Sequence, residues 1–587
     1  MSQRRIGHLS CCLLSAIALT ASLALAAART SGAPPPPDWL VLLSALHKAP
    51  AGDRLPPSLP KLSLSAARGE CEGAQIALIP GARLIDVTSD VGTDESVALA
   101  LFRLDFIEIQ VPSNAEGRVG RWPDPLIPER DPATGQRVPA FLQPAQPGEP
   151  TLLYVELCVP NAAKPGARRV HLDLSARRPD GEPAHFRLPI ELRVHAFALP
   201  ATSTFATSFG FSSISAAHQH GLAEEAPPVQ AALTQRYAAA ALRHRVSLHG
   251  LSMEPPALVS RDPLRLDFTA HDAELAPLLD GTLLPSGARA TSFDVRLHPA
   301  LRGDEAAVRA YFRLYAEHLR QRGWLDQAFF YVADEPREAD LPDIARRARL
   351  VRAAAPGLRV LVAHALHPQL DGAIDIWAAN LNCLFERPGD GYCPAILAPE
   401  RYAGPRKEGA RLWWYQSCGS HGCADAGGLP QAQQAYFEGW PSYMIDHDAA
   451  LNRSMGALAF AHGIDGEIYF NTVEAWHPIE VEGHRTKTDP WRDVLRFHGN
   501  GDGTLFYPGT PQRLGSAAHM PIESLRLKHL RDGLEDFEYL ALAQGLGLRR
   551  AARAFIQALV PSPWQIQRSP EHWDKARQAL ARAIEAR

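Results

Sequence analysis

Eight strand-like segments follow one another between residues 205 and 471, and helix-like segments separate several of them. The strand-like segments are 205–211, 246–251, 292–297, 328–333, 359–365, 374–380, 411–417 and 466–471, with long helical patterns at 305–321 and 344–354. Alternating strands and helices are typical of a parallel sheet covered by helices. Eight such strands over about 300 residues fit a closed barrel. We therefore predict a (β/α)8 barrel over residues 201–509.

The region before the barrel, residues 38–200, has a different pattern of short strands separated by Pro and Gly. Apolar residues alternate with polar ones at 61–66, 74–79, 152–157, 169–174 and 188–194. Period-two alternation with frequent turns is typical of antiparallel sheets packed face to face. We predict an antiparallel β-sandwich here, and we favour packing against the barrel over independent sugar binding as its role.

The region after the barrel, residues 510–587, is predicted to be a helical segment that packs on the barrel. Apolar residues recur at helical spacing over 522–546, and 569–587 resembles a terminal helix. The first helix carries many charges between Arg526 and Glu538. Such charges usually form a solvated face or pair with neighbours, so we assign them a structural role.

The N-terminus has the layout of a secretory signal peptide over residues 1–28, followed by a Pro-rich linker over 29–37. Arg4 and Arg5 precede an apolar run from 13 to 27 that ends in small residues. A membrane span needs about 20 apolar residues, whereas Ser and Thr interrupt this run. We expect cleavage, a secreted or periplasmic location and no stable membrane insertion.

Net charge and cysteine content indicate which classes of substrate, metal and partner the protein is expected to bind. The formal net charge of −4 provides no general basic field, which argues against nucleic acid and favours a neutral or weakly charged substrate. Six cysteines lie beyond the leader, and Cys418 and Cys423 enclose a short loop with His421. The spacing matches no ordinary zinc pattern, so we favour a loop-closing disulfide over a metal. We expect no metal or cofactor, and the sequence does not indicate an oligomeric state.

The fourth strand-like segment ends in the acidic pair Asp334 and Glu335, followed by Pro336. Barrel enzymes place their chemistry at the carboxyl ends of the strands. The two-residue period directs Tyr331, Ala333 and Glu335 toward the barrel axis. Pro336 ends the strand, and the bend turns Asp334 toward the same ligand. The tripeptide alone is weak evidence, because it is more often a turn or a helix cap.

Polar and aromatic residues of the last two strands strengthen this site. Alternation places Leu412 and Trp414 on the outer face, and it places Ile468 and Phe470 opposite the inward residues of the last strand. The predicted substrate-binding residues are Trp413, Tyr415, Glu467, Tyr469, Asn471 and Trp476. Aromatic rings stack on the apolar faces of sugars. Core packing explains Trp413, Tyr415 and Tyr469 equally well, and Trp476 is either a ring platform or a loop anchor.

Neighbouring carboxylates suit glycosidic cleavage of a sugar whose 2-acetamido oxygen attacks the anomeric carbon. Glu335 would protonate the leaving oxygen and later deprotonate water, while Asp334 would accept the acetamido N–H. Two alternatives stay open. A conventional retaining glycosidase would use Glu335 with Glu467 or Glu386 as nucleophile, at a separation of about 5 Å. A noncatalytic glycan-binding protein could keep the same scaffold.

Several motifs occur in an order that resembles glycoside hydrolase family 123 and the related domain of unknown function 4091. They are 67–73, 122–128, 331–336, 413–415, 489–491, 501–509 and 524–539, of which the segment Arg531-Asp-Gly-Leu-Glu-Asp-Phe-Glu-Tyr539 is the most specific. Family members of established activity are β-N-acetylgalactosaminidases that use the acetamido-assisted route. The resemblance implies a retaining exo-β-N-acetylhexosaminidase in which Asp334 and Glu335 hold the two catalytic roles. Sugar configuration, linkage and natural glycan stay open.

Overall fold

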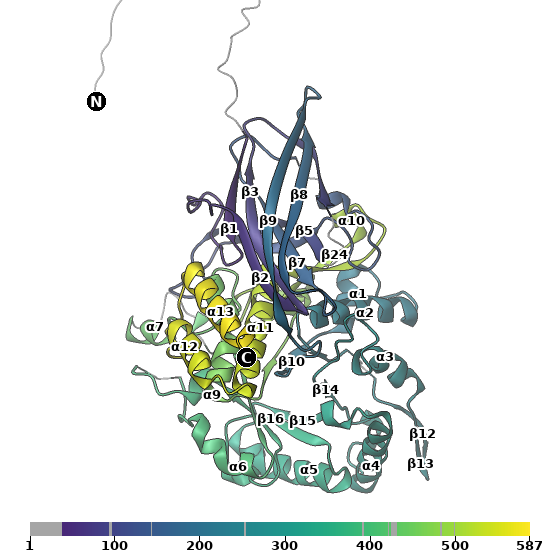
Figure 1. Ribbon diagram of the computed structural model, residues 1–587. Coiled ribbons are helices and arrows are strands. Elements are labelled where there is room, and N and C mark those ends of the chain that lie inside the picture. The colour runs from purple at the N-terminus through teal and green to yellow at the C-terminus, as the bar shows by residue number, and fades with distance from the viewer. Residues whose placement is uncertain are drawn as a thin grey trace, which may run out of the picture.

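The computed structural model describes residues 38–587 apart from 93–96, 142–143, 252–253, 390–391, 419, 421, 424–430, 482–483 and 498. The predicted leader and linker, residues 1–37, lie outside the described residues. Figure 1 shows a long twisted sheet region at the top, a helix-covered barrel below it and the C-terminal helices beside both. Within the described residues, no helix combines the length and the apolar character that a membrane crossing requires.

Two sheets form the N-terminal region. The seven-stranded sheet has the order β1-β3-β7-β5-β6-β25-β24, and the four-stranded sheet has the order β2-β9-β8-β4. The strands from this region are β1 (Trp39–Ser44), β2 (Leu62–Arg68), β3 (Glu70–Ile79), β4 (Ile85–Gly92), β5 (Ala98–Ile109), β6 (Gly120–Pro128), β7 (Thr151–Val159), β8 (Gly166–Arg177) and β9 (Pro183–Ala198). One buried core combines residues of both sheets, such as Ile76 and Val155 from one with Leu172 and Ile190 from the other.

One pairing in this region differs from the antiparallel prediction, because β2 runs parallel to β9. Strands joined by a tight turn must be antiparallel, whereas parallel neighbours need a long connection. More than a hundred residues separate β2 from β9, and they supply that connection. The prediction of a wholly antiparallel region is therefore wrong at this strand.

The barrel contains a parallel strand in every one of the eight predicted segments. The strands are β10 (Ala206–Gly210), β11 (Leu248–His249), β14 (Phe293–Asp294), β15 (Ala328–Asp334), β16 (Arg359–Ala363), β17 (Ile376–Asn380), β18 (Arg411–Tyr415) and β19 (Gly466–Tyr469). Pairing of β10 with β19 joins the first strand to the last. In the described part of the chain no strand pairing joins β11 to β14, so the barrel is nearly closed.

Helices and small hairpins follow the barrel strands. The helices are α1 (Ser213–His220), α2 (Pro227–Arg243), α3 (Thr269–Leu279), α4 (Glu305–Arg322), α5 (Leu341–Ala354), α6 (Ala403–Lys407), α7 (Gln431–Phe437), α8 (Ala449–Arg453) and α9 (Met455–His462). The hairpins pair β12 (Ala257–Arg261) with β13 (Leu264–Asp267), β20 (Ile479–Val481) with β21 (His484–Thr486), and β22 (Leu495–Arg496) with β23 (Gly499–Asn500). The Asp304 side chain caps the start of α4, and Gly323 ends this helix in the left-handed conformation.

The C-terminal region returns to the first sheet before it becomes helical. Strands β24 (Phe506–Gly509) and β25 (Met520–Ser524) pair with each other, and β25 pairs with β6. The short α10 (Pro511–Leu514) lies between them, and α11 (Leu525–Gly545), α12 (Arg549–Leu559) and α13 (Pro570–Glu585) follow. Helix α11 contacts α8 and α9 of the barrel as well as β3 and β6 of the sheet. It therefore lies between the two parts of the molecule.

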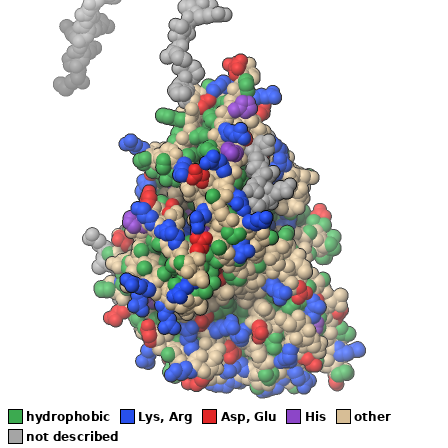
Figure 2. All heavy atoms as spheres, viewed as in Figure 1, with side chains coloured by type: hydrophobic (Ala, Val, Ile, Leu, Met, Phe, Trp, Pro, Cys, Tyr) green, Lys and Arg blue, Asp and Glu red, His purple; other side chains and the backbone are tan. Residues whose placement is uncertain are grey.

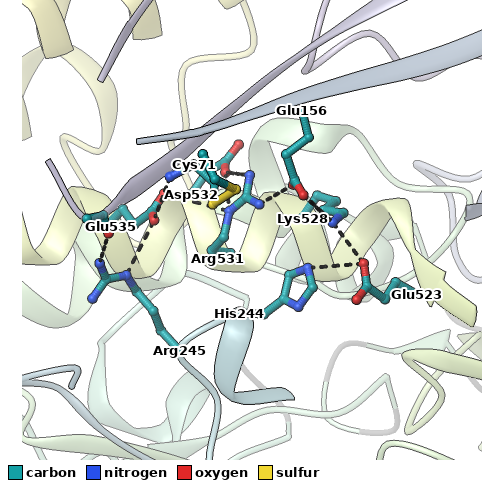
Figure 3. The surroundings of a disulfide bond; sticks show 11 residues. Cys71, Glu156, His244, Arg245, Glu523, Lys528, Arg531, Asp532 and Glu535 are labelled. Carbon is teal, nitrogen blue, oxygen red and sulfur yellow. Dashed lines mark hydrogen bonds and ion pairs between the residues drawn. A yellow bond between two sulfur atoms is a disulfide. The ribbon is translucent and has the colours of Figure 1, made fainter. Parts of the chain in front are cut away.

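The charges of α11 are buried, so the expectation of a solvated face is wrong and the expectation of pairing is confirmed. Figure 3 shows Arg531 and Lys528 of α11 pointing to Glu156 of the sheet, and Glu535 pointing to Arg245 of the barrel. The distance from Lys528 Nζ to Glu156 Oε1 is 3.0 Å. These pairs span an interface that excludes water, which is why the charges need partners from both sides.

Arg526 and Asp124 form the most enclosed of these pairs, with both side chains 0% exposed. The guanidinium donates to both Asp124 oxygens, at 3.0 and 2.8 Å, and to the carbonyl oxygens of Tyr443, Gly501 and Thr504. Burial alone would raise the pKa of Asp124, but the charge and hydrogen bonds of Arg526 outweigh it and lower that pKa. The pair links β6 to α11 and to the loops beside the barrel.

We expect Asp124→Asn to destabilise the protein by about 3–5 kcal/mol, because it leaves the Arg526 charge buried without a counter-charge. Urea unfolding followed by circular dichroism measures the loss. Lys61→Met is the matched control, since it breaks an exposed pair with Glu191 and should leave the unfolding midpoint unchanged. Equal midpoints for the two variants would contradict the role given to the buried pair.

Candidate active site

Apolar side chains fill the inside of the barrel and form a floor for its mouth. This inner cluster contains Ala206, Phe329, Leu361, Ile376, Ala378, Trp413 and Ile468, with Tyr331 and Tyr415 partly buried against it. Trp413 is 1% exposed, and Tyr415 follows it on the same face, nearer the carboxyl end of β18. A Cβ atom on Gly466 would lie 2.6 Å from Trp413 Cε2, so the glycine leaves room for the indole.

A β-bulge brings Asp334 to the inner face at the end of β15. Tyr331 pairs with Leu361 of β16, but the next pairing joins Ala333 to Val362, so Val332 is an extra residue. A bulge reverses the alternation of side chains beyond it. Ala333 consequently packs on the outer core rather than toward the axis as predicted, and Asp334 takes the inner position.

Glu335 reaches the same mouth through an unusual backbone conformation. Its φ angle is 40°, and its amide donates to the Ala363 carbonyl oxygen at 3.1 Å. Residues other than glycine rarely adopt positive φ, and such positions concentrate at functional sites. The bulge and this turn together place two adjacent carboxylates at the open end of the barrel, where both are exposed.

Each carboxylate has its own tyrosine. Tyr331 donates its hydroxyl to Asp334 Oδ1 at 2.7 Å, and Tyr415 donates its hydroxyl to Glu335 Oε1 at 2.5 Å. Burial raises the pKa of both tyrosines far above the usual value, and the neighbouring carboxylates raise it further. The tyrosines therefore remain protonated donors. Each one fixes one carboxylate oxygen and leaves the second oxygen to a ligand.

Other polar residues at the mouth escaped the sequence analysis. Asn380 pairs in register with Tyr415 and donates to the Tyr392 hydroxyl at 3.3 Å. On the side of β11 and β14, Ser208 Oγ lies 3.0 Å from His249 Nδ1, and Asp294 pairs with Arg296 at 2.9 Å. Asn380, His249 and Asp294 are the last residues of their strands. Asn380 also ends its predicted segment, so a polar residue at the end of a predicted strand was the signal for it. His249 and Asp294 lie inside predicted segments that end at Leu251 and Leu297, so the sequence contained no such signal for them.

His249 lies within reach of the charges of Asp294 and Asp334. Burial lowers the pKa of His249, while the charges of Asp294 and Asp334 act in the opposite direction. Strand register places His249 opposite Gly210 and Asp294 opposite Phe329, whose ring belongs to the inner cluster. The mouth is thus lined by polar side chains from at least five strands.

In the last barrel strand, β19, the side chains that point into the barrel are not the predicted ones. Ile468 packs inside the barrel, whereas Glu467 pairs in register with Trp414, and Tyr469 with Phe209, on the outer side. The prediction that Glu467 and Tyr469 face the axis is therefore wrong. Trp413 fills the interior opposite Gly466, and this contact sets the alternation along β19.

Glu467 and Tyr469 have buried polar partners instead of an open site. Tyr443 donates its hydroxyl to Glu467 Oε1 at 2.9 Å, and Tyr469 donates to Asp502 Oδ1 at 2.9 Å. Both residues are at most 1% exposed. Hydrogen-bonded polar groups of this kind are a feature of a packed core rather than of a ligand surface.

Asn471 and Trp476 hold the loop after β19. The Asn471 side chain donates to Glu474 Oε2 at 2.7 Å, and its Oδ1 accepts hydrogen bonds from the backbone amides of residues 472 and 473. Trp476 is 2% exposed and donates to the Phe506 carbonyl oxygen at 3.2 Å. It is a loop anchor, which is one of the two predicted roles. Of the six predicted binding residues, the structure places Tyr415 beside the acids.

Three disulfides join the six cysteines that the described residues contain. They are Cys71–Cys158, Cys383–Cys393 and Cys418–Cys423. The last bond confirms the predicted loop closure, and His421 lies outside the described residues. Across the described ranges, no group of three or more His, Cys, Asp or Glu side chains is placed to hold a metal ion.

Glu467 gives a pH-dependent prediction. Burial raises its pKa to about 8, against the opposing effect of the Tyr443 hydrogen bond. The folded state thus binds a proton that the unfolded chain releases, and this stability is complete at low pH and is lost as pH rises toward 8. Relative to Glu467→Gln, the wild type should lose up to about 1.4 kcal/mol per pH unit between pH 5 and 8. Urea unfolding at several pH values checks this, and parallel curves for the two proteins would refute it.

Comparisons with known proteins agree with this architecture. Residues 303–543 match the model of the glycoside hydrolase 123 catalytic domain. A family 123 glycoside hydrolase from Clostridium perfringens has a similar structure, with a TM-score of 0.63 and 12% identity over 94% of this chain and 98% of that one. No curated protein sequence matches significantly.

Two further solved structures are less similar. A family 39 glycoside hydrolase from Bacteroides cellulosilyticus gives a TM-score of 0.33 at 8% identity, covering 81% of this chain and 82% of that one. A Bacteroides ovatus xyloglucanase gives 0.27 at 8% identity, covering 81% and 98%. Scores this low support no argument. The matched region includes β15, both acids and both tyrosines, so residues 303–543 are similar to the catalytic domain of a family 123 glycoside hydrolase.

Proposed function

We propose that the protein is an exported, retaining exo-β-N-acetylhexosaminidase of the galactosaminidase type, acting on glycans or glycoconjugates by acetamido-assisted catalysis. The supporting observation is the pair of adjacent, exposed carboxylates at the barrel mouth, each held by its own tyrosine. The similar Clostridium perfringens enzyme was studied for glycolipid glycan hydrolysis. The relation to the domain of unknown function 4091 stays a prediction.

In the first step, Glu335 acts as the general acid. Tyr415 holds Oε1, so Oε2 transfers the proton to the glycosidic oxygen as the bond from that oxygen to C1 breaks. The acetamido carbonyl oxygen attacks C1 at the same time and forms an oxazolinium ion. Asp334 accepts the acetamido N–H through the oxygen that Tyr331 leaves open, and its charge stabilises the cation.

In the second step, Glu335 acts as the general base. Its carboxylate takes a proton from water, whose oxygen attacks C1 and opens the oxazoline ring. Two inversions at C1 give net retention of configuration. Each tyrosine binds one oxygen of its carboxylate and leaves the other oxygen to act. The free oxygen of Glu335 transfers the proton, and the free oxygen of Asp334 accepts the acetamido N–H.

A conventional nucleophile fits the geometry less well. Such a mechanism needs a second carboxylate about 5 Å from the acid. Glu467 lies on the outer face of β19, and its raised pKa keeps it protonated at neutral pH. Glu386 is exposed on the segment closed by Cys383 and Cys393, so it is included in the test below.

Export is supported by the pattern of residues 1–28 and by the disulfides. Disulfides persist in secreted and periplasmic proteins and are rare in the cytosol. Figure 2 shows acidic and basic side chains interspersed over the visible face, and the formal net charge of the whole chain is −4. We propose a periplasmic or extracellular enzyme whose partner is a neutral glycan.

We expect Glu335→Gln and Asp334→Asn to lower kcat on nitrophenyl β-glycosides of 2-acetamido sugars by about 10²–10⁴, with less effect when the aglycone leaves easily. Wild type should not hydrolyse the matching glycosides that lack the acetamido group. Steady-state assays across both substrate sets measure this.

Glu467→Gln and Glu386→Gln serve as controls and should keep the wild-type rate. Loss of activity in either control, or turnover of sugars without the acetamido group, would favour a protein nucleophile. Unchanged rates in both acid-pair variants would discard the site. Binding of glycans without any hydrolysis would make the protein a noncatalytic binder.

A further inference from the structure

We propose that Tyr392 forms the subsite for the leaving group, where its ring stacks on the sugar to which the cleaved residue is attached. This subsite rests on the proposed function and adds a ligand class to it. The occupant is a neutral pyranose ring, bound through its apolar face. The Cys383–Cys393 disulfide holds the platform in place.

The chemistry of Glu335 fixes the side of the mouth on which the leaving group lies. A general acid must come within hydrogen-bonding distance of the glycosidic oxygen that it protonates. The first ring of the leaving group therefore lies beside Glu335. Because Tyr415 of β18 is hydrogen-bonded to Glu335, this ring lies on the β18 side of the barrel mouth. Asn380 of the neighbouring strand β17 is level with Tyr415 and donates to the Tyr392 hydroxyl.

Tyr392 presents an open aromatic surface at this position. The residue is 42% exposed, in contrast to Trp413 and Trp476, which are nearly fully buried. Burial of part of the ring raises the pKa of Tyr392, and the charge of Glu335 raises it further. Aromatic faces of this kind bind the C–H face of sugar rings.

The ring of Tyr392 is held from three directions. Its hydroxyl accepts from Asn380, and its ring contacts Phe437 in an edge-on arrangement with centroids 6.1 Å apart. The adjacent Cys393 is bonded to Cys383, which lies in the 3-10 turn Leu381–Leu384 that follows β17. A platform fixed before the ligand arrives loses little conformational entropy on binding.

The test compares two substrates of the wild type and of Tyr392→Ala, Tyr392→Phe and Trp39→Ala. One substrate is a disaccharide with a terminal β-linked N-acetylhexosamine, and the other is the methyl β-glycoside of the same sugar. Tyr392→Ala should lower kcat/KM for the disaccharide about 10-fold, mainly through KM, because stacking is lost. The methyl glycoside has no second ring and should be unaffected.

Two matched variants distinguish loss of ring stacking at Tyr392 from effects that any loss of an aromatic residue would have. Tyr392→Phe keeps the ring and should keep most of the disaccharide activity. Trp39→Ala removes an exposed aromatic residue of the N-terminal sheet and should change neither substrate. The double variant Cys383→Ser, Cys393→Ser should lower disaccharide turnover selectively, and thermal unfolding of each variant verifies that it is folded.

Each other outcome has a defined meaning. Equal losses of kcat/KM on both substrates would show that Tyr392 acts through Glu335. No loss on the disaccharide would place the leaving group elsewhere. Either result would overturn the proposal that Tyr392 forms the leaving-group subsite. Wild type that hydrolyses neither substrate would overturn the proposed function itself, and the subsite with it.

Discussion

Buried charge pairing along α11 is the constraint on which the rest of this structure depends. Arg526, Lys528 and Arg531 face Asp124 and Glu156 of the sheet, while Glu535 faces Arg245 of the barrel. A buried charge without a partner is very costly, so these pairs disfavour arrangements of sheet, helix and barrel that would separate them. Arg526 also binds carbonyl oxygens at residues 501 and 504, and the adjacent Asp502 accepts the Tyr469 hydroxyl. The geometry beside β19 is thus tied to the domain interface.

The acidic pair shows how a local irregularity creates a site. In a regular strand, two consecutive side chains point to opposite faces. The extra residue at Val332 and the positive φ of Glu335 remove that opposition and bring Asp334 and Glu335 together. Tyr331 and Tyr415 then fix one oxygen of each carboxylate. The chemistry therefore depends on backbone features that the residue types alone do not specify.

Sequence patterns predicted the barrel well because buried parallel strands are apolar runs separated by helices. Seven of the eight strands lie within the expected segments and β15 extends one residue past its segment, and the inward direction of Trp413 and Tyr415 is confirmed. The predicted side-chain directions were wrong at Ala333, where a β-bulge intervenes. They were also wrong at Glu467, because the preceding Gly466 faces Trp413 inside the barrel and Glu467 therefore points outward. Neither cause is local, because both depend on the neighbouring strand.

The pairing of β25 with β6 has a consequence for how the chain acquires its structure. During synthesis β6 emerges early, and its outer edge stays without its final neighbour until the barrel has been made. An open edge strand invites pairing with other chains. That edge is covered only when residues 520–524 have been synthesised. Folding of the N-terminal sheet is therefore completed by a strand from near the C-terminus. We expect a version truncated before β25 to expose this edge and aggregate, even with Asp334 and Glu335 present.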